Sequence, residues 1–328
     1  MIKFRDAQYC NLKLFLIFLV IYGHLIEPKI WNSEILMVQY RWIYLVHMPL
    51  FSFLSGLFIN HQKHCRMQFL RIFPLYVFLQ TLAVLLGNGL VKAFTPWWIF
   101  WYLLSYSIWL CVSYLWFRFC KGKWGIAILL FSIIAGCLVG LIPYIGREFS
   151  LSRTIVFFPY FWAGVIIDPT FNWKKLRWIG FSSLVIVVTI MLCLGDEIPV
   201  TFLYQTSSYN DADDILLRLL CYLLAVLLGI FLLSFSSMKR LPFTKLGTNT
   251  MFPYLFHAPF VLLIREFDYP WYYNIVIAVA FLYITYKLTQ WHNSLYGIKS
   301  TERRDNSWQL FNKSMKNKQD RFIDSYYP

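Results

Sequence analysis

The stretch NLKLFLIFLVIYGHLIE, residues 11–27, is apolar along most of its length and carries two ionisable side chains, Lys13 and His24. Its length is close to the roughly 20 residues that a helix needs to cross the hydrocarbon core of a bilayer. Ionisable groups are costly in that setting and mark functional sites. At about 100° per residue, eleven steps return Lys13 and His24 to one helix face, about 16 Å apart along the axis. The pair therefore predicts a membrane helix with a functional face, long enough for a thin ligand with an anionic end and a reactive end.

The composition of the whole chain supports a membrane protein. Of 328 residues, 59% are hydrophobic and only 14% are charged, whereas soluble domains carry about 25% charged residues. Mean hydropathy is +0.55. We predict an all-α fold, a polytopic integral membrane bundle of about ten transmembrane helices. The expected spans are 11–27, 40–59, 69–87, 97–118, 124–144, 154–167, 178–195, 215–235, 248–264 and 271–291.

The distribution of Lys and Arg predicts the orientation of the chain. With the N-terminus inside, 20 of these residues fall in inner segments and seven in outer ones. Inner loops of membrane proteins are enriched in Lys and Arg, so we expect both termini to be cytoplasmic. Residues 1–291 would form the transmembrane domain, and 292–328 a basic cytoplasmic tail that contacts lipid or is partly disordered.

Charge and cysteine usage exclude several classes of function. The net charge of +14 is divided among short inner loops and the tail, which argues against a nucleic-acid surface. The seven cysteines are scattered and show no CxxC or Cys/His ligand spacing. We interpret them as small apolar packing residues and expect neither a disulfide framework nor a zinc site. The outer segment 196–214 is acidic and rich in hydroxyl groups; it is either a solvated loop or a surface that helps to hold a sugar acceptor.

A second histidine, His47, is expected at a depth comparable with His24. It precedes Pro49 in the second segment, where a proline frees a backbone carbonyl and favours a kink. An intramembrane histidine is often only a hydrogen-bonded core residue, and that interpretation stays open for His47. His257 lies in the middle of the ninth segment and is expected to face the bundle.

Two arginines stand at segment ends. Arg71 opens the third segment on the predicted inner side. It is either an interface anchor or a partner of Lys13 in a clamp for an anionic ligand, since guanidinium groups suit bidentate phosphate contacts. Arg153 precedes the short sixth segment at the predicted outer boundary, where it either anchors the helix or stabilises a developing oxyanion.

These residues together resemble the integral-membrane acyltransferase-3 family, whose signature on the first helix is a basic residue, ten residues and a histidine, here Lys13 to His24. Further motifs match in order along the chain: His47-Met48-Pro49-Leu50-Phe51 with Leu54-Ser55-Gly56, Phe69-Leu70-Arg71 with Pro74, Trp101-Tyr102-Leu103, Ser152-Arg153 with Phe158-Pro159-Tyr160, and Leu246-Gly247 with His257. The set covers nearly the whole chain and is most similar to capsule and fucose-type sugar O-acetylases. The chain departs from the family pattern at Lys13, where many members carry Arg, and at Cys10, where Asp is common.

The resemblance implies a membrane-bound O-acyltransferase of the bacterial cell membrane. It would move an acetyl group from cytoplasmic acetyl-CoA, a co-substrate, to a hydroxyl of a capsular or exopolysaccharide or of its lipid-linked repeat unit, without a metal. Lys13 and Arg71 would hold the CoA phosphates. His24 would act as general base or carry an acetyl group, with Glu27 or His47 orienting its ring and Arg153 stabilising the oxyanion.

Two other classes of function stay open on the sequence. Intramembrane histidines and a proline-broken helix also fit a transporter or flippase for a glycolipid or small solute. The chain shows no internal repeat, although many transporters are built from repeats. A non-enzymatic scaffold for envelope assembly is the third possibility, and it predicts that His24 and Arg71 can be replaced without effect.

Overall fold

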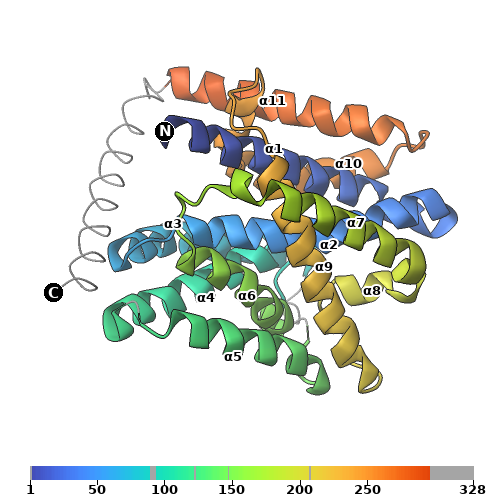
Figure 1. Ribbon diagram of the computed structural model, residues 1–328. Helices are drawn as coiled ribbons and strands as arrows, with labels where there is room; N and C mark the ends of the chain where they lie inside the picture. The colour runs from blue at the N-terminus through green and yellow to red at the C-terminus, as the bar shows by residue number, and fades with distance from the viewer. Residues whose placement is uncertain (1, 89–93, 122, 147, 207, 296–328) are drawn as a thin grey trace. The chain divides into compact units, whose positions relative to one another are not determined.

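Each of the ten predicted segments contains a helix in the computed structural model, which describes residues 2–88, 94–121, 123–146, 148–206 and 208–295. No strand occurs within these ranges, so the all-α prediction is confirmed (Figure 1). The helices are α1 (Ile2–Ile26), α2 (Glu34–Leu57), α3 (Gln62–Ala83), α4 (Trp101–Leu115), α5 (Gly125–Leu138), α6 (Leu151–Ile166), α7 (Arg177–Leu194), α8 (Val200–Leu203), α9 (Asp213–Phe235), α10 (Met251–Arg265) and α11 (Tyr273–Leu295).

Six of these helical stretches are long and apolar enough to cross a membrane, and α5 and α10 belong to shorter apolar helices. The number of ten spans and the sides on which the termini lie therefore stay predictions. The outward surfaces support contact with lipid. Trp178 and Leu192 on α7 are 83% and 82% exposed, and Phe131 on α5 is 72% exposed. Large contiguous apolar surfaces of this kind are rare in soluble monomers.

Two helices begin where the hydropathy pattern does not show it. α2 starts at Glu34, six residues before the predicted span, because the hydroxyl of Ser33 accepts a hydrogen bond from the amide of Leu36 and caps the helix. α4 starts at Trp101, four residues later than predicted. The preceding turn contains Trp98 with a positive φ of 29°, which a helix cannot contain.

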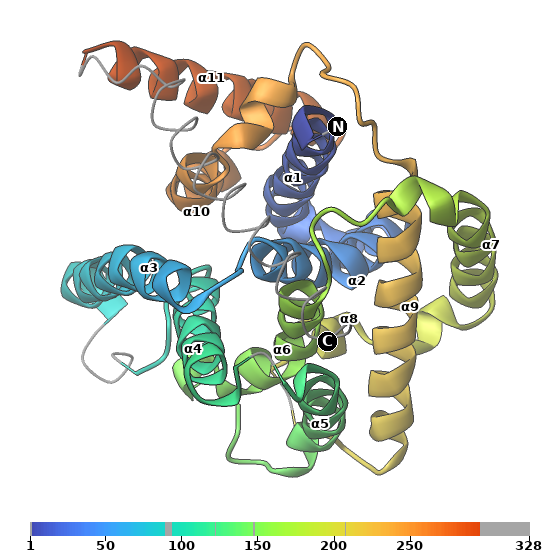
Figure 2. The ribbon, with the colours of Figure 1, turned by 60° about the vertical axis from the view of Figure 1, so that its left-hand side comes forward.

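The interior is organised around α2, which packs along α6 and also contacts α1 and α9. Its crossing with α6 is unusually close. A Cβ on Gly56 would collide with the backbone carbonyl of Phe161, and a Cβ on Gly164 with that of Phe53. Small residues let helix backbones approach in this way. Beyond this pair, α5 lies against α6 and α7 runs beside α9 (Figure 2).

The chain divides into two compact units, with the boundary after Ala278 inside α11. The first unit, from the N-terminus to Ala278, holds every residue of the site described below. The predicted tail begins at 292, but α11 continues to Leu295, and residues 296–328 lie outside the described ranges.

Candidate active site

A cavity of about 520 Å³ lies in the first unit, lined by residues of α1, α2, α3, α4, α6 and α10 and of the segments 95–99 and 203–206. Its lining includes all four residues predicted to be catalytic, His24, Glu27, His47 and Arg153. They come from three helices and a turn that are far apart in the sequence. The volume falls within the range of ordinary small-molecule sites.

His24 lies near the C-terminal end of α1 with its ring held between two others. The ring centroid of Trp98 is 4.8 Å away at an interplanar angle of 67°, and that of His257 is 5.3 Å away at 22°. His257 is completely buried, which confirms that it faces the bundle. The two neighbours restrict the orientation of the His24 ring before any substrate binds.

A carboxylate contacts one nitrogen of this ring. Glu27 begins the 3₁₀ turn Glu27–Asn32 directly after α1, and its Oε2 lies 3.4 Å from Nδ1 of His24. Such contacts are often long before substrate binds. A carboxylate oxygen accepts a hydrogen bond from Nδ1–H and fixes the tautomer. The other nitrogen, Nε2 of His24, then carries the lone pair and has no hydrogen-bond partner among the described residues.

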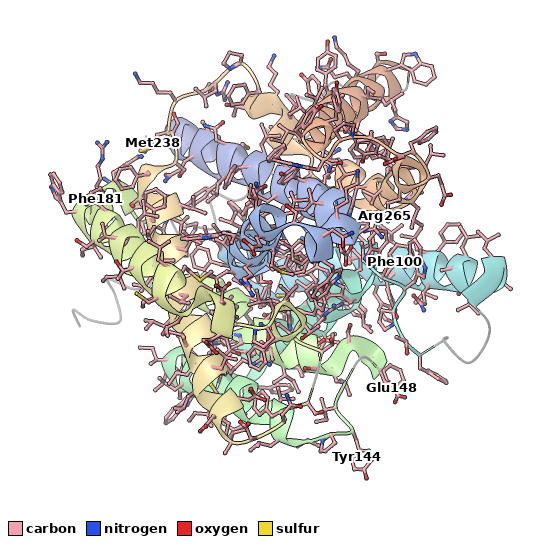
Figure 3. The ribbon with its side chains drawn as sticks, turned by 90° about the vertical axis from the view of Figure 1, so that its right-hand side faces the viewer. Phe100, Tyr144, Glu148, Phe181, Met238 and Arg265 are labelled. Atoms are coloured by element: carbon pink, nitrogen blue, oxygen red, sulfur yellow. The ribbon has the colours of Figure 1, made fainter. Side chains whose placement is uncertain are left out.

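Arg265, the last residue of α10, completes this arrangement. Its Nη2 donates to Oε2 of Glu27 at 2.6 Å and to the backbone carbonyl of His24 at 2.8 Å. Its guanidinium carbon lies 5.1 Å from the ring centroid of Trp98. Figure 3 labels Arg265, the last residue of α10, and Phe100, the residue before α4. Nothing local in the sequence connects Arg265 to Glu27, which lies 238 positions earlier.

His47 lies on α2 with its ring centroid 4.7 Å from that of Tyr44. Its Nδ1 is 2.6 Å from the carbonyl oxygen of Ile43. Because a carbonyl can only accept, this nitrogen must carry the hydrogen. Two residues were proposed to orient the ring of His24. Glu27 contacts that ring, whereas the Nδ1 of His47 is engaged with the backbone of its own helix.

Arg153 lies in the first turn of α6 and is held by two contacts. Its Nε donates to the carbonyl of Tyr204 at 2.8 Å, and its guanidinium carbon lies 4.9 Å from the ring centroid of Trp101. The next residue after Tyr204, Gln205, has a positive φ of 60°, and its carbonyl accepts from the hydroxyl of Ser152 at 2.7 Å. Positive φ is uncommon for residues other than glycine, and strained backbone clusters at functional sites.

The two residues predicted to bind the acyl donor lie outside this cavity. Nζ of Lys13 is 4.6 Å from the ring centroid of Phe58, the residue that follows α2. Arg71 is exposed on α3. Among the described residues, no group of three or more His, Cys, Asp or Glu side chains is placed to hold a metal ion.

The fold and this site define a helical membrane protein with a histidine–carboxylate pair in a cavity among its helices. The sequence model of the acyltransferase-3 family, described as an acyltransferase domain, matches residues 9–288. The chain belongs to this family, and membership implies a multi-pass membrane acyltransferase. The resemblance found in the sequence is thus confirmed at the level of the family, while the capsule and fucose-type branch stays a prediction. No curated protein and no solved structure matches the chain.

Proposed function

We propose that the protein is an O-acetyltransferase of the bacterial cytoplasmic membrane. It would move an acetyl group from cytoplasmic acetyl-CoA to a hydroxyl of a cell-surface polysaccharide or of its lipid-linked repeat unit. The observation that carries this proposal is the hydrogen bonding of the two ring nitrogens of His24. Glu27, itself held by Arg265, engages Nδ1, and Nε2 is left with its lone pair in a residue that lines the cavity.

The reaction uses this lone pair as a general base, a role worth about 10²–10⁴-fold in rate. The hydroxyl proton of the acceptor passes to Nε2 of His24 while the hydroxyl oxygen attacks the thioester carbon. The negative charge develops on the former carbonyl oxygen, which the guanidinium of Arg153 stabilises. Collapse of the tetrahedral intermediate breaks the carbon–sulfur bond. The departing thiolate takes the proton from His24, which leaves the ester, the CoA thiol and a neutral imidazole.

An acetyl group carried on Nε2 of His24 is a second route that uses the same lone pair. In that route the thioester acylates the imidazole first, CoA leaves, and the acceptor hydroxyl then attacks the acyl carbon. Brief incubation with labelled acetyl-CoA and no acceptor distinguishes the routes, since label bound to the protein indicates the acyl-histidine and its absence indicates direct transfer.

The proposed path of the donor follows α1. Lys13 and Arg71 would hold the CoA phosphates on the inner side, about 16 Å along the helix axis from His24. The cavity reaches Val20, one turn from His24. Ile17, the next residue toward Lys13 on this face, is fully buried. Access of the thioester from the inner side therefore requires side chains around Ile17 to move.

Acetyl transfer by purified protein tests the proposal. The full chain is reconstituted in lipid nanodiscs and incubated with radiolabelled acetyl-CoA and surface polysaccharide from cells that lack the protein. Labelled ester is expected with the native chain and not with His24→Ala at equal protein level. The same comparison in cells uses NMR of the O-acetyl signals of the polysaccharide. Full acetylation with His24→Ala contradicts the role of His24 as the base. If the native chain transfers no acetyl group, a transporter or a scaffold becomes the better explanation of the protein's function.

A further inference from the structure

His47 shares the cavity with His24, but its environment suits a different task. The residue is 3% exposed and lines the cavity beside Tyr44. Its Nδ1–H is fully engaged by the carbonyl of Ile43. No hydrogen-bond partner of its Nε2 is found within the described part of the chain. A neutral imidazole with this tautomer offers the cavity a hydrogen-bond acceptor and no donor.

The partners of the two histidines separate their roles. The ring of His24 contacts a carboxylate, which stabilises the imidazolium that forms when Nε2 takes a proton. The ring of His47 contacts only a neutral backbone carbonyl and is almost completely buried, so a charge on it is costly. His24 is thus the better base, and His47 the better acceptor for a hydroxyl that keeps its proton.

We propose that His47 binds a second hydroxyl of the acceptor, beside the hydroxyl that His24 activates. This inference rests on the proposed function and narrows the acceptor to a ring or polyol with two neighbouring hydroxyls. The ring of Tyr44 contacts both histidines, with its centroid 4.7 Å from that of His47 and 6.5 Å from that of His24. In the proposed complex, one small molecule along Tyr44 engages both Nε2 atoms.

The rest of the lining fits the same ligand. Trp98, Trp101 and Phe157 also line the cavity, and aromatic rings offer flat apolar surfaces for the C–H face of a sugar ring. With two hydroxyls fixed, only one of them is presented to His24. His47 thereby determines which hydroxyl receives the acyl group, and it acts as a specificity-determining residue.

The test compares one-hydroxyl and two-hydroxyl acceptors of equal ring size. Nanodisc-reconstituted protein is given acetyl-CoA with either cyclohexanol or cis-cyclohexane-1,2-diol, and the acetyl ester is quantified. The native chain is expected to favour the diol in kcat/KM by about five- to tenfold, the effect of one hydrogen bond. In His47→Phe, which keeps a ring but has no lone pair, the preference should fall to the statistical advantage of two equivalent hydroxyls.

His47→Gln is the matched control. Both variants lose the Nδ1–H bond to the Ile43 carbonyl, so any damage to α2 is common to them, but only glutamine retains an acceptor at its end. We expect His47→Gln to keep most of the preference for the diol. Loss of the preference in both variants, its retention in His47→Phe, or its absence in the native chain overturns the inference.

The native polysaccharide supplies a measurement that does not depend on surrogate alcohols. NMR of this polysaccharide should show the acetyl group at one ring position with the native chain and with His47→Gln, but at more than one position with His47→Phe. A single unchanged position with His47→Phe overturns the inference while leaving acetyl transfer intact. If the native chain transfers no acetyl group to any acceptor, it is the proposed function that fails.

Discussion

Replacing Arg265 by glutamine is expected to slow acetyl transfer, although Arg265 is on the last turn of α10 and Glu27 lies 238 positions before it in the sequence. The guanidinium donates to Glu27 at 2.6 Å and to the backbone carbonyl of His24 at 2.8 Å. Both side chains of the ion pair are only about one quarter exposed, at 26% and 25%. Hydrogen bonds to charged groups contribute about 1.5–3 kcal/mol, and we take about 2 kcal/mol for their effect on the transition state. This corresponds to about a 30-fold lower kcat.

The pair should behave as one unit. Glu27→Gln removes the same support of His24 from the other side, so its kcat should fall by a similar factor. The double variant Glu27→Gln with Arg265→Gln should be hardly slower than either single variant, because the second substitution finds its partner already missing. Independent contributions would instead multiply to roughly 900-fold.

The assay is the initial rate of label transfer from acetyl-CoA to polysaccharide in nanodiscs, with kcat and KM determined separately. Arg177→Gln is the matched control. Its guanidinium carbon lies 5.1 Å from the ring centroid of Phe235, as that of Arg265 lies 5.1 Å from Trp98, but Phe235 does not line the cavity whereas Trp98 does. Its kcat should be unchanged. A multiplicative double variant, or an Arg265→Gln variant with native kcat, refutes the positioning role of Arg265.

Three further predictions concern other parts of the chain. Gly56→Ala should lower the melting temperature in detergent, because its methyl group meets the carbonyl of Phe161 and overpacking costs about 1–3 kcal/mol. Gly229→Ala, whose added Cβ has an ordinary nearest contact of 3.8 Å, should leave the melting temperature unchanged. Equal melting temperatures for the two variants would contradict the close crossing of α2 and α6. Arg153→Gln should lower kcat by about 10²-fold or more with little change in the KM for acetyl-CoA, the signature of lost oxyanion stabilisation; an unchanged kcat excludes that role. Lys13→Ala should raise the KM for acetyl-CoA while Lys13→Arg keeps it, and an unaltered KM in Lys13→Ala shows that Lys13 does not hold the donor.

The sequence predicted the helices well because a bilayer imposes a length and a polarity on each span. The same reliance on apolar length and polarity made the predicted helix ends inaccurate. The first turn of α2 begins at Glu34, a charged residue outside the apolar window, yet the cap by Ser33 fixes the start of the helix there. The beginning of α4 was wrong because Trp98 adopts a positive φ, and no local pattern announces that conformation in a tryptophan.

The candidate site was also predictable from the sequence only in part. His24, His47 and Arg153 stood out because charged or ionisable groups are rare in apolar segments, and the cavity brings them together. Arg265 did not stand out, since a cation at a helix end is ordinary in a membrane protein. Its role depends on α1 and α10 meeting, which is a property of tertiary structure. The same holds for the stacking of His257 on His24.

The proposed reaction accounts for a signature with both ends on one helix. Transfer at the outer side with a donor made on the inner side requires two sites at a fixed separation and on a common face. A continuous helix such as α1, which includes Lys13 and His24 without a break, sets both quantities through its rise and rotation per residue. One residue more or less between them would rotate His24 by about 100° relative to Lys13. The spacing of ten residues is thus a geometric requirement of the proposed reaction, whichever hydroxyl accepts the acetyl group.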